Sequence, residues 1–468
     1  MCWGVCALNR QEYLTALTNQ IRTKRARTMV AEEVEAHIED QKQDFIAHGL
    51  DEAEAESMAV AEMGDPIEAG IELDCIHRPK MEWTILISVL VVSVMGLILQ
   101  AIITASFPTT SVNTVNAFKN NFLYGGVWIS LLIGIVMMLG ISYLDYSLLV
   151  KYSFPIWIIL EVPAILSILS QIFFDESIWI GPMVNGRSVL QMYLSYLVIP
   201  FYAGTVYHFR GKGKKGLLLC ILCLGISVFA DLSIPFTVSA VVTGVTGLIL
   251  IHLAIRQGWF GEEKKKLIVR IWSVIGICIV IVGVFTCLGD RHFMKEYQVR
   301  RLTAIVTGNH YDYTRDAVAE VAQGQEISKW SSEPNYKTGN ELINDESTKL
   351  GDSLLYNSAR NDYIWTYLSH YFGIAKVIFF IAIFAIFLAL LLHMAVRQKN
   401  RLGYIVSIGC VLYLILQSAF YVGANIGIFP FGDAFMPLLS HGNMNMLITY
   451  FYLGILLSVY RNTNIVKN

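Results

Sequence analysis

Apolar runs long enough to cross a lipid bilayer recur along most of this sequence, and no other feature limits its fold so strongly. A transmembrane α-helix needs about 20 mostly apolar residues, because the hydrocarbon core of a bilayer is about 30 Å thick. We place such spans at 84–105, 122–144, 153–173, 188–208, 216–232, 235–255, 267–288, 373–396, 403–424 and 441–460. The sequence therefore predicts an all-α integral membrane protein with about ten transmembrane helices.

The composition agrees with a polytopic membrane protein and argues against other classes. Hydrophobic residues make up 55% of the 468 residues and charged residues only 15%, and the mean hydropathy is +0.52. The core of one soluble domain cannot bury that much apolar surface. A net charge of −2 gives no basic signature for nucleic acid. The eight cysteines precede the spans or lie within them, so they predict no disulfide framework.

Residues 1–81 carry mixed charges and no apolar run of spanning length, which predicts a small cytoplasmic helical domain without a signal peptide. The domain contains three segments of helical composition, at 14–26, 31–50 and 51–66. In the second of them Val34, Ile38 and Phe45 fall roughly on one face, as in an amphipathic helix. The domain resembles the prefix that precedes some bacterial permeases, and a regulatory or docking role and a passive role in membrane insertion both remain open.

Basic residues between the spans predict the orientation of the chain. They occur at Lys151, at 208–215, 256–266 and 397–401, and at Arg461. All of them fall on the side of the N-terminal domain, and cytoplasmic loops are enriched in Lys and Arg. Both termini are therefore expected in the cytoplasm. The membrane domain, 82–468, then carries one large extracytoplasmic loop at about 289–371, and a loop of that length is usually functional or disordered.

Asp362 stands where this outer loop meets an apolar span. One interpretation makes Asn361 or Asp362 a helix N-cap, accepting a hydrogen bond from a free amide of the first turn. The other makes Asp362 a general base at the lipid–water boundary, where partial desolvation tunes a carboxylate for proton transfer. The two interpretations are compatible.

Two stretches also share a longer pattern. Residues 361–373 read NDYIWTYLSHYFG, and residues 417–461 end in LGILLSVYR. The second stretch carries at fixed spacing Gln417, Gly423, Gly427, Pro430, Pro437, Ser440 and Gly442. These stretches resemble the T-D-F-I-F phrase and the closing Q-x-F-x-N-x-G pattern of the SEDS family, the FtsW/RodA/SpoVE cell-wall polymerases. The likeness covers about residues 84–461.

The resemblance implies a peptidoglycan glycosyltransferase of the bacterial cytoplasmic membrane that polymerises lipid II at its outer face, together with a class B penicillin-binding protein. Asp362 matches the family's essential aspartate and would deprotonate the 4-hydroxyl of the acceptor sugar. Arg291, Lys295, Arg300 and Arg301 are candidates for neutralising the pyrophosphate leaving group, and a divalent cation such as Mg²⁺ or Mn²⁺ could share this role. In an equally open interpretation, these four residues bind anionic membrane lipids. The sequence has no metal-ligand spacing.

Four further residues are candidates for substrate binding. Glu161 lies within the third span and Asp231 at the outer end of the fifth, where charge is costly and commonly lines a cavity. Asp231 also resembles the Asp of the family's Q-P-D-x-G phrase, and Ser440 and Gly442 belong to the family's closing pattern. For Glu161 the structural alternative is a partner within the bundle, either a Tyr, a Ser or a backbone group.

The sequence also departs from the family pattern. His370 and Tyr371 replace the family's paired glutamates, and Tyr421 replaces the Asn of Q-x-F-x-N. Two other functions are therefore weighed: a lipid II flippase, in which Glu161 and Asp231 would matter more than Asp362, and a catalytically inactive scaffold of the wall-synthesis machinery.

The predicted orientation can be tested by cysteine labelling. We expect a membrane-impermeant maleimide to label an Asp362→Cys variant on intact cells, above the signal of the parent chain. An Asp51→Cys variant, in the cytoplasmic domain, should react only after permeabilisation. Labelling of position 362 only after permeabilisation would contradict the orientation.

Overall fold

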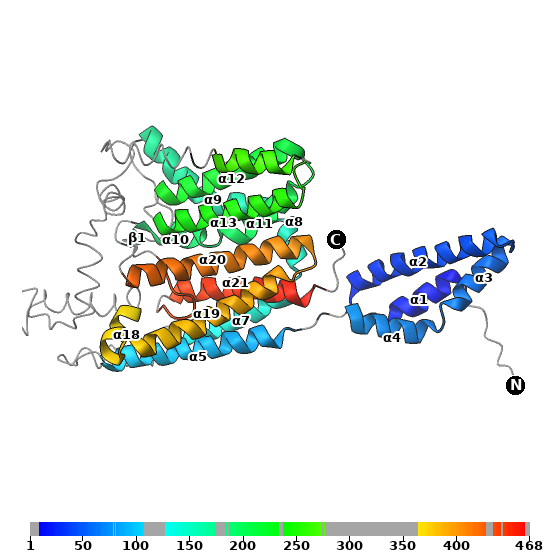
Figure 1. Cartoon of the computed structure of the whole chain (residues 1–468), viewed down its shortest axis with the longest axis horizontal. Coiled ribbons are helices and arrows are strands. Elements are labelled where there is room, and N and C mark those ends of the chain that lie inside the picture. The colour runs from blue at the N-terminus through cyan, green and yellow to red at the C-terminus, as the bar shows by residue number, and fades with distance from the viewer. Residues whose placement is uncertain are drawn as a thin grey trace, which may run out of the picture. The chain divides into compact units, whose positions relative to one another are not determined.

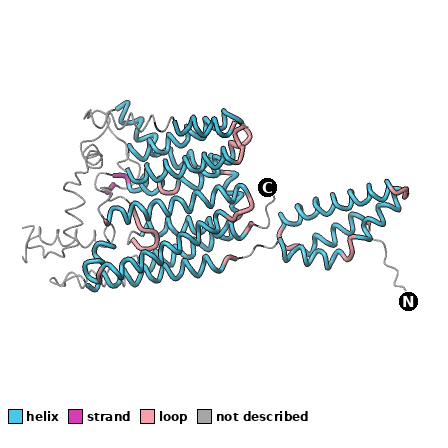
Figure 2. The backbone as a smooth tube through the Cα atoms, in the orientation of Figure 1, coloured by secondary structure: helices cyan, strands magenta, loops and turns pink. Residues whose placement is uncertain are grey.

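The computed structural model describes residues 9–77, 79, 81–106, 127–174, 183–184, 187–233, 237–261, 263–273, 276, 364–426, 434–440 and 443–463. The described residues are mainly helical, as Figure 2 shows. β1 (Met183–Val184) and β2 (Arg187–Ser188) form one short antiparallel pair. Contacts divide the chain into two compact units. The first consists of residues 1–82, 398–403 and 458–468, and the second of residues 83–397 and 404–457.

The N-terminal helices of the first unit are α1 (Arg10–Gln20), α2 (Lys24–Ala47), α3 (Glu52–Glu62) and α4 (Pro66–His77) (Figure 1). Helix α1 packs on α4, and α2 packs on α3. Their shared core is formed by Tyr13, Leu17, Ile21, Ala26, Val30, Val34, Ile38, Ala59 and Val60, with Phe45 partly buried against it. The amphipathic face predicted for Val34, Ile38 and Phe45 is therefore confirmed.

The expectation of three helices in this unit was wrong, because the structure has four. Pro66 does not end the last helix but begins α4. Proline suits the first position of a helix, where its missing N–H has no partner to lose. Asp74 of α4 then accepts a hydrogen bond from the Arg22 amide at 2.9 Å, which ties α4 to the turn after α1.

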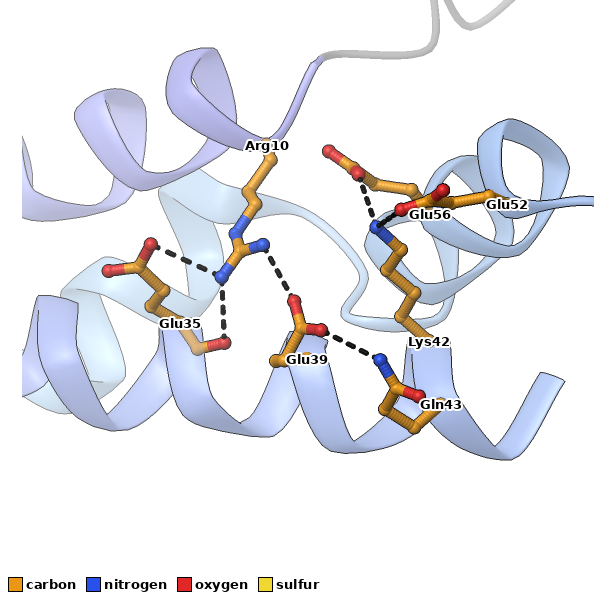
Figure 3. Close-up of polar contacts among 7 residues, drawn as sticks. All are labelled: Arg10, Glu35, Glu39, Lys42, Gln43, Glu52 and Glu56. Carbon is orange, nitrogen blue, oxygen red and sulfur yellow. Dashed lines mark hydrogen bonds and ion pairs between the residues drawn. The ribbon is translucent and has the colours of Figure 1, made fainter. Parts of the chain in front are cut away.

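Two basic side chains each bridge a pair of glutamates between these helices (Figure 3). Arg10 contacts Glu35 at 3.2 Å and Glu39 at 2.9 Å, which joins α1 to α2. Lys42 joins α2 to α3 by contacting two glutamates, Glu52 at 2.9 Å and Glu56 at 3.2 Å. Hydrogen bonds from Gln43 and Arg10 lower the pKa of Glu39, and the bonds to Glu52 and Glu56 raise the pKa of Lys42.

The second unit is a bundle of roughly parallel helices (Figure 1). Its elements are α5 (Trp83–Ser106), α7 (Val127–Tyr143), α8 (Tyr146–Lys151), α9 (Ser153–Phe174), α10 (Val189–Ser195), α11 (Val198–His208), α12 (Gly213–Ser233), α13 (Thr237–Arg256), α18 (Ile364–Phe372), α19 (Ile374–Val396) and most of α20 (Arg401–Asn425) and α21 (Asn443–Arg461). Seven helices in the described ranges are long and apolar enough to cross a membrane, and α7 is a shorter apolar helix. The predicted all-α membrane fold is confirmed. The predicted span 267–288 lies largely outside the described residues.

The span predicted at 188–208 is not one helix. It divides into α10 and α11 at residues 196–197. Pro200 has no N–H to donate to the Tyr196 carbonyl, so a continuous helix would lose a hydrogen bond there. The hydroxyl of Tyr452, on α21, donates to that carbonyl instead, at 2.8 Å. Helix α11 is the buried centre of the bundle and packs against α8, α9, α12 and α13.

Glycine permits a close approach between α7 and α21. A methyl group at Gly134 would overlap the ring of Tyr450. That ring is fixed from the other side, because the Tyr450 hydroxyl lies 2.7 Å from the Ser93 hydroxyl of α5. Small residues at helix contacts are typical of membrane bundles, where tight packing rather than hydrophobicity holds helices together.

We expect Gly134→Ala to lower the melting temperature of the purified protein, because overpacking in a well-packed core costs about 1–3 kcal/mol. Gly140→Ala is the matched control, since Gly140 lies on the same helix and its added methyl would meet open space. Thermal unfolding in detergent, followed by gel-filtration recovery, measures both variants. Equal melting temperatures for the two would contradict the tight α7–α21 contact.

Candidate functional site

The predicted site residues divide into two groups. Asp362, Arg291, Lys295, Arg300, Arg301 and Gly442 lie outside the described residues. Glu161, Asp231 and Ser440 are described, and each is only 3% exposed. The structure brings Glu161 and Asp231 into one cluster, and it places Ser440 in a separate buried turn.

Glu161 pairs with Ser227. The Ser227 hydroxyl, on α12, donates to the Glu161 carboxylate of α9 at 2.5 Å, and the Trp157 indole donates to the same hydroxyl at 3.0 Å. Trp157 and Glu161 are one helical turn apart on α9, so both reach the same point of α12. This arrangement is the structural alternative expected for Glu161, with serine as the partner.

Asp231 lies one turn beyond Ser227 on α12 and is surrounded by hydroxyl groups. Ser239 of α13 donates to its carboxylate at 3.0 Å. The side chains of Ser195 and Thr243, from α10 and α13, lie beside it. Three helices therefore meet at one buried carboxylate. Because a buried charge without partners is strongly unfavourable, these hydroxyls are what permit Asp231 to sit inside the bundle.

Glu161 has a hydrogen-bond partner in either protonation state, because its neighbour is a hydroxyl, which can donate or accept. The Ser227 hydroxyl has a single proton and two acceptors in reach, Glu161 and the Cys223 carbonyl at 3.2 Å. If Glu161 is protonated, it can donate to Ser227 while Ser227 donates to Cys223. The group is thus satisfied in either protonation state.

Ser440 stabilises a buried turn. The Met436 amide donates to the Ser440 hydroxyl at 2.8 Å, and the Ser440 amide donates to the Met436 carbonyl at 3.0 Å. Leu438 within the turn has a φ of 63°, and Gln100 of α5 donates to the Leu439 carbonyl at 2.7 Å. The described segment 434–440 is thus non-helical and buried. The contacts shown give Ser440 a structural role.

Helix α18, which follows Asp362 in the sequence, is bonded to the end of α20. The Ile364 amide donates to the Tyr421 hydroxyl at 3.2 Å, and the Trp365 amide donates to the Asn425 side-chain oxygen at 3.1 Å. Amides of the first helical turn have no partner within their own helix. Leaving such a donor buried and unsatisfied costs about 1–3 kcal/mol. Two side chains from a distant helix therefore cap α18.

Sequence reasoning missed Ser227, Asn425 and the role of Tyr421. A signal was present for each, since Ser227 precedes Asp231 by four residues and Tyr421 precedes Asn425 by four. Spacing of four puts two side chains on one helix face. The sequence could not show which other helix that face meets. Among the described residues, no group of three or more His, Cys, Asp or Glu side chains could hold a metal ion.

We expect Ser227→Ala to destabilise the protein by about 1–3 kcal/mol, because it removes the partner of both Glu161 and the Trp157 indole. Ser233→Ala on the same helix is the matched control, since the Ser233 hydroxyl bonds only the Ala230 carbonyl in the contacts shown. Thermal unfolding of both variants in detergent gives the comparison. A Ser227 variant no less stable than the Ser233 variant would contradict this bridge.

This chain is similar in part of its sequence to proteins named as probable peptidoglycan glycosyltransferases FtsW. A probable peptidoglycan glycosyltransferase FtsW of Thioalkalivibrio sp. (strain K90mix) is 30% identical over 125 residues, which are 25% of this chain and 31% of that protein. A probable peptidoglycan glycosyltransferase FtsW of Legionella pneumophila is 24% identical over 204 residues, which are 41% of this chain and 46% of that protein. The chain thus matches less than half the length of either relative. No family model matches the chain.

The fold is also shared with a solved structure. That structure is described as "Structural coordination of polymerization and crosslinking by a peptidoglycan synthase complex", and its chain superposes with a TM-score of 0.58 at 15% identity. The match covers 82% of this chain and 98% of that chain, so nearly the whole neighbouring fold is present here. The chain therefore shares a helical membrane fold with that structure, and its sequence matches to the FtsW relatives cover 25% and 41% of it at low identity.

Proposed function

We propose that the chain is a peptidoglycan glycosyltransferase that polymerises lipid II at the outer face of the bacterial cytoplasmic membrane. The observation that carries the proposal is the retention of Asp362 in the NDYIWTY phrase of a chain with this fold and with FtsW relatives. The polymer formed would serve cell division, elongation or sporulation.

Asp362 acts as general base in the proposed reaction. Its carboxylate takes the proton from the 4-hydroxyl of the acceptor sugar, and the oxygen attacks the anomeric carbon of the donor. The bond from that carbon to the undecaprenyl pyrophosphate breaks, and the pyrophosphate leaves with its negative charge. Arg291, Lys295, Arg300 and Arg301, which belong to the same outer loop in sequence, neutralise that charge in the proposal.

A class B penicillin-binding protein is the proposed partner. The structural neighbour belongs to a complex that coordinates polymerisation with crosslinking. A polymerase at the membrane surface makes a glycan that a crosslinking enzyme must receive, so an interaction between the two keeps the product close to the second reaction.

Two alternatives stay distinct from the polymerase. A flippase would need polar side chains directed at a substrate path inside the bundle. Glu161 and Asp231 are buried and bonded by hydroxyls of neighbouring helices, so their geometry does not favour that role. A catalytically inactive scaffold would bind its partners without forming polymer.

We expect the purified full chain, mixed with a class B penicillin-binding protein and labelled lipid II, to form glycan polymer. The Asp362→Ala variant should lose on the order of 100-fold or more of the rate, because general base catalysis typically contributes about 10²–10⁴-fold. Asp352→Ala is the matched control, an aspartate of the same loop ten residues earlier in the sequence. Gel electrophoresis of the labelled product measures the rate.

Each outcome decides between the functions. Polymer from the parent and from Asp362→Ala at equal rates would remove Asp362 from the mechanism. Polymer from neither, while a known polymerase works in the same mixture, would overturn the proposed function and favour the scaffold.

A further inference from the structure

Helix α18 is a nine-residue element placed directly before the membrane span α19. Its C-terminal end is defined by Gly373, whose φ of 81° suits glycine and whose amide donates to the Ser369 carbonyl at 3.0 Å. Four of its side chains, those of Ile364, Trp365, Tyr367 and Leu368, are at most 4% exposed. The helix is therefore docked into the bundle along its first half.

The N-terminal end of α18 is held by α20 and not by its own residues alone. Tyr421 and Asn425 are one turn apart at the end of α20, and they are 1% and 5% exposed. The Asn425 side-chain amide donates to the Tyr421 carbonyl at 2.9 Å, which fixes the direction of its oxygen toward the Trp365 amide. The Tyr421 hydroxyl accepts from the adjacent Ile364 amide.

This arrangement joins two parts of the chain that lie 57 and 60 residues apart. Both acceptors are neutral side-chain oxygens and both donors are backbone amides. The first turn of α18 is consequently held by these two oxygen atoms as well as by its buried side chains.

We propose that Tyr421 and Asn425 are positioning residues for the polymerisation reaction. They hold the first turn of α18, which begins at Ile364. Ile364 follows Asp362 by two residues in the sequence, so a fixed first turn restrains the position of Asp362 in the proposed reaction. The inference rests on the proposed function of Asp362 as general base. Small displacements of a reacting group reduce rates strongly, whereas substrate binding elsewhere on the protein is unaffected.

Hydrogen exchange and kinetics of the full chain test the proposal together. Tyr421→Phe removes only the accepting hydroxyl, and Asn425→Leu removes the accepting oxygen at similar volume. In both variants we expect amide exchange in peptides covering residues 364–372 to rise about tenfold or more, and kcat to fall by a similar factor with KM within about twofold.

Two variants provide controls. Asn425→Asp keeps an oxygen that can accept from the Trp365 amide but loses the amide that donates to the Tyr421 carbonyl, so its exchange and kcat should lie between those of Asn425→Leu and the parent. Tyr404→Phe makes the same substitution at the other end of α20, and it should change neither quantity.

Unchanged exchange in Tyr421→Phe and Asn425→Leu would overturn the anchor itself. Faster exchange with unchanged kcat would overturn the positioning role. An inactive parent would overturn the proposed function and the catalytic part of this inference with it, while the exchange rates would still decide whether α20 holds α18.

Discussion

Every backbone group inside a membrane bundle needs a hydrogen-bond partner from the protein, and the structure of this chain depends on how that requirement is met where helices break. Lipid offers no substitute for water, so an irregular backbone survives only where side chains supply the missing bonds. Tyr452 does so for the Tyr196 carbonyl at the break before α11. Tyr421 and Asn425 do so for the first amides of α18. The bundle can therefore contain breaks without losing its order.

Carboxylates are stabilised by different means in the two units. In the N-terminal helices, Glu39 and Glu52 bond to Arg10 and Lys42, and both glutamates are also exposed to water. In the bundle, Glu161 and Asp231 bond to serine hydroxyls. A cation placed inside the membrane would add its own desolvation penalty, which ion pairing offsets only in part. Neutral hydroxyl groups avoid that penalty and still satisfy the carboxylate oxygens.

These side-chain hydrogen bonds affect the proposed function by fixing the positions of helices. The proposed chemistry belongs to the outer loop, and the described residues next to it in sequence are those of α18. Two other buried polar sites have structural roles: the cluster between α9, α12 and α13, and the turn at Ser440. Their hydrogen bonds join helices or close a turn. The end of the bundle at α18 is thus the part whose order the proposed reaction requires, and α20 contributes to it from far along the chain.

Hydropathy alone located most of the helices, because the length and apolarity of a span are properties of consecutive residues. The same local signals placed Val34 and Ile38 in a core and Glu161 inside a span. They failed at Pro66, which begins a helix, and at 188–208, where a break depends on Tyr452 from the far end of the sequence. They could also not identify Ser227 as the partner of Glu161, or Tyr421 and Asn425 as the caps of α18. Sequence by itself determined the membrane class, most of the spans and the candidate residues. Only the tertiary structure decided which polar groups bond to one another, because those bonds join residues that are distant along the chain and near only after the helices have packed.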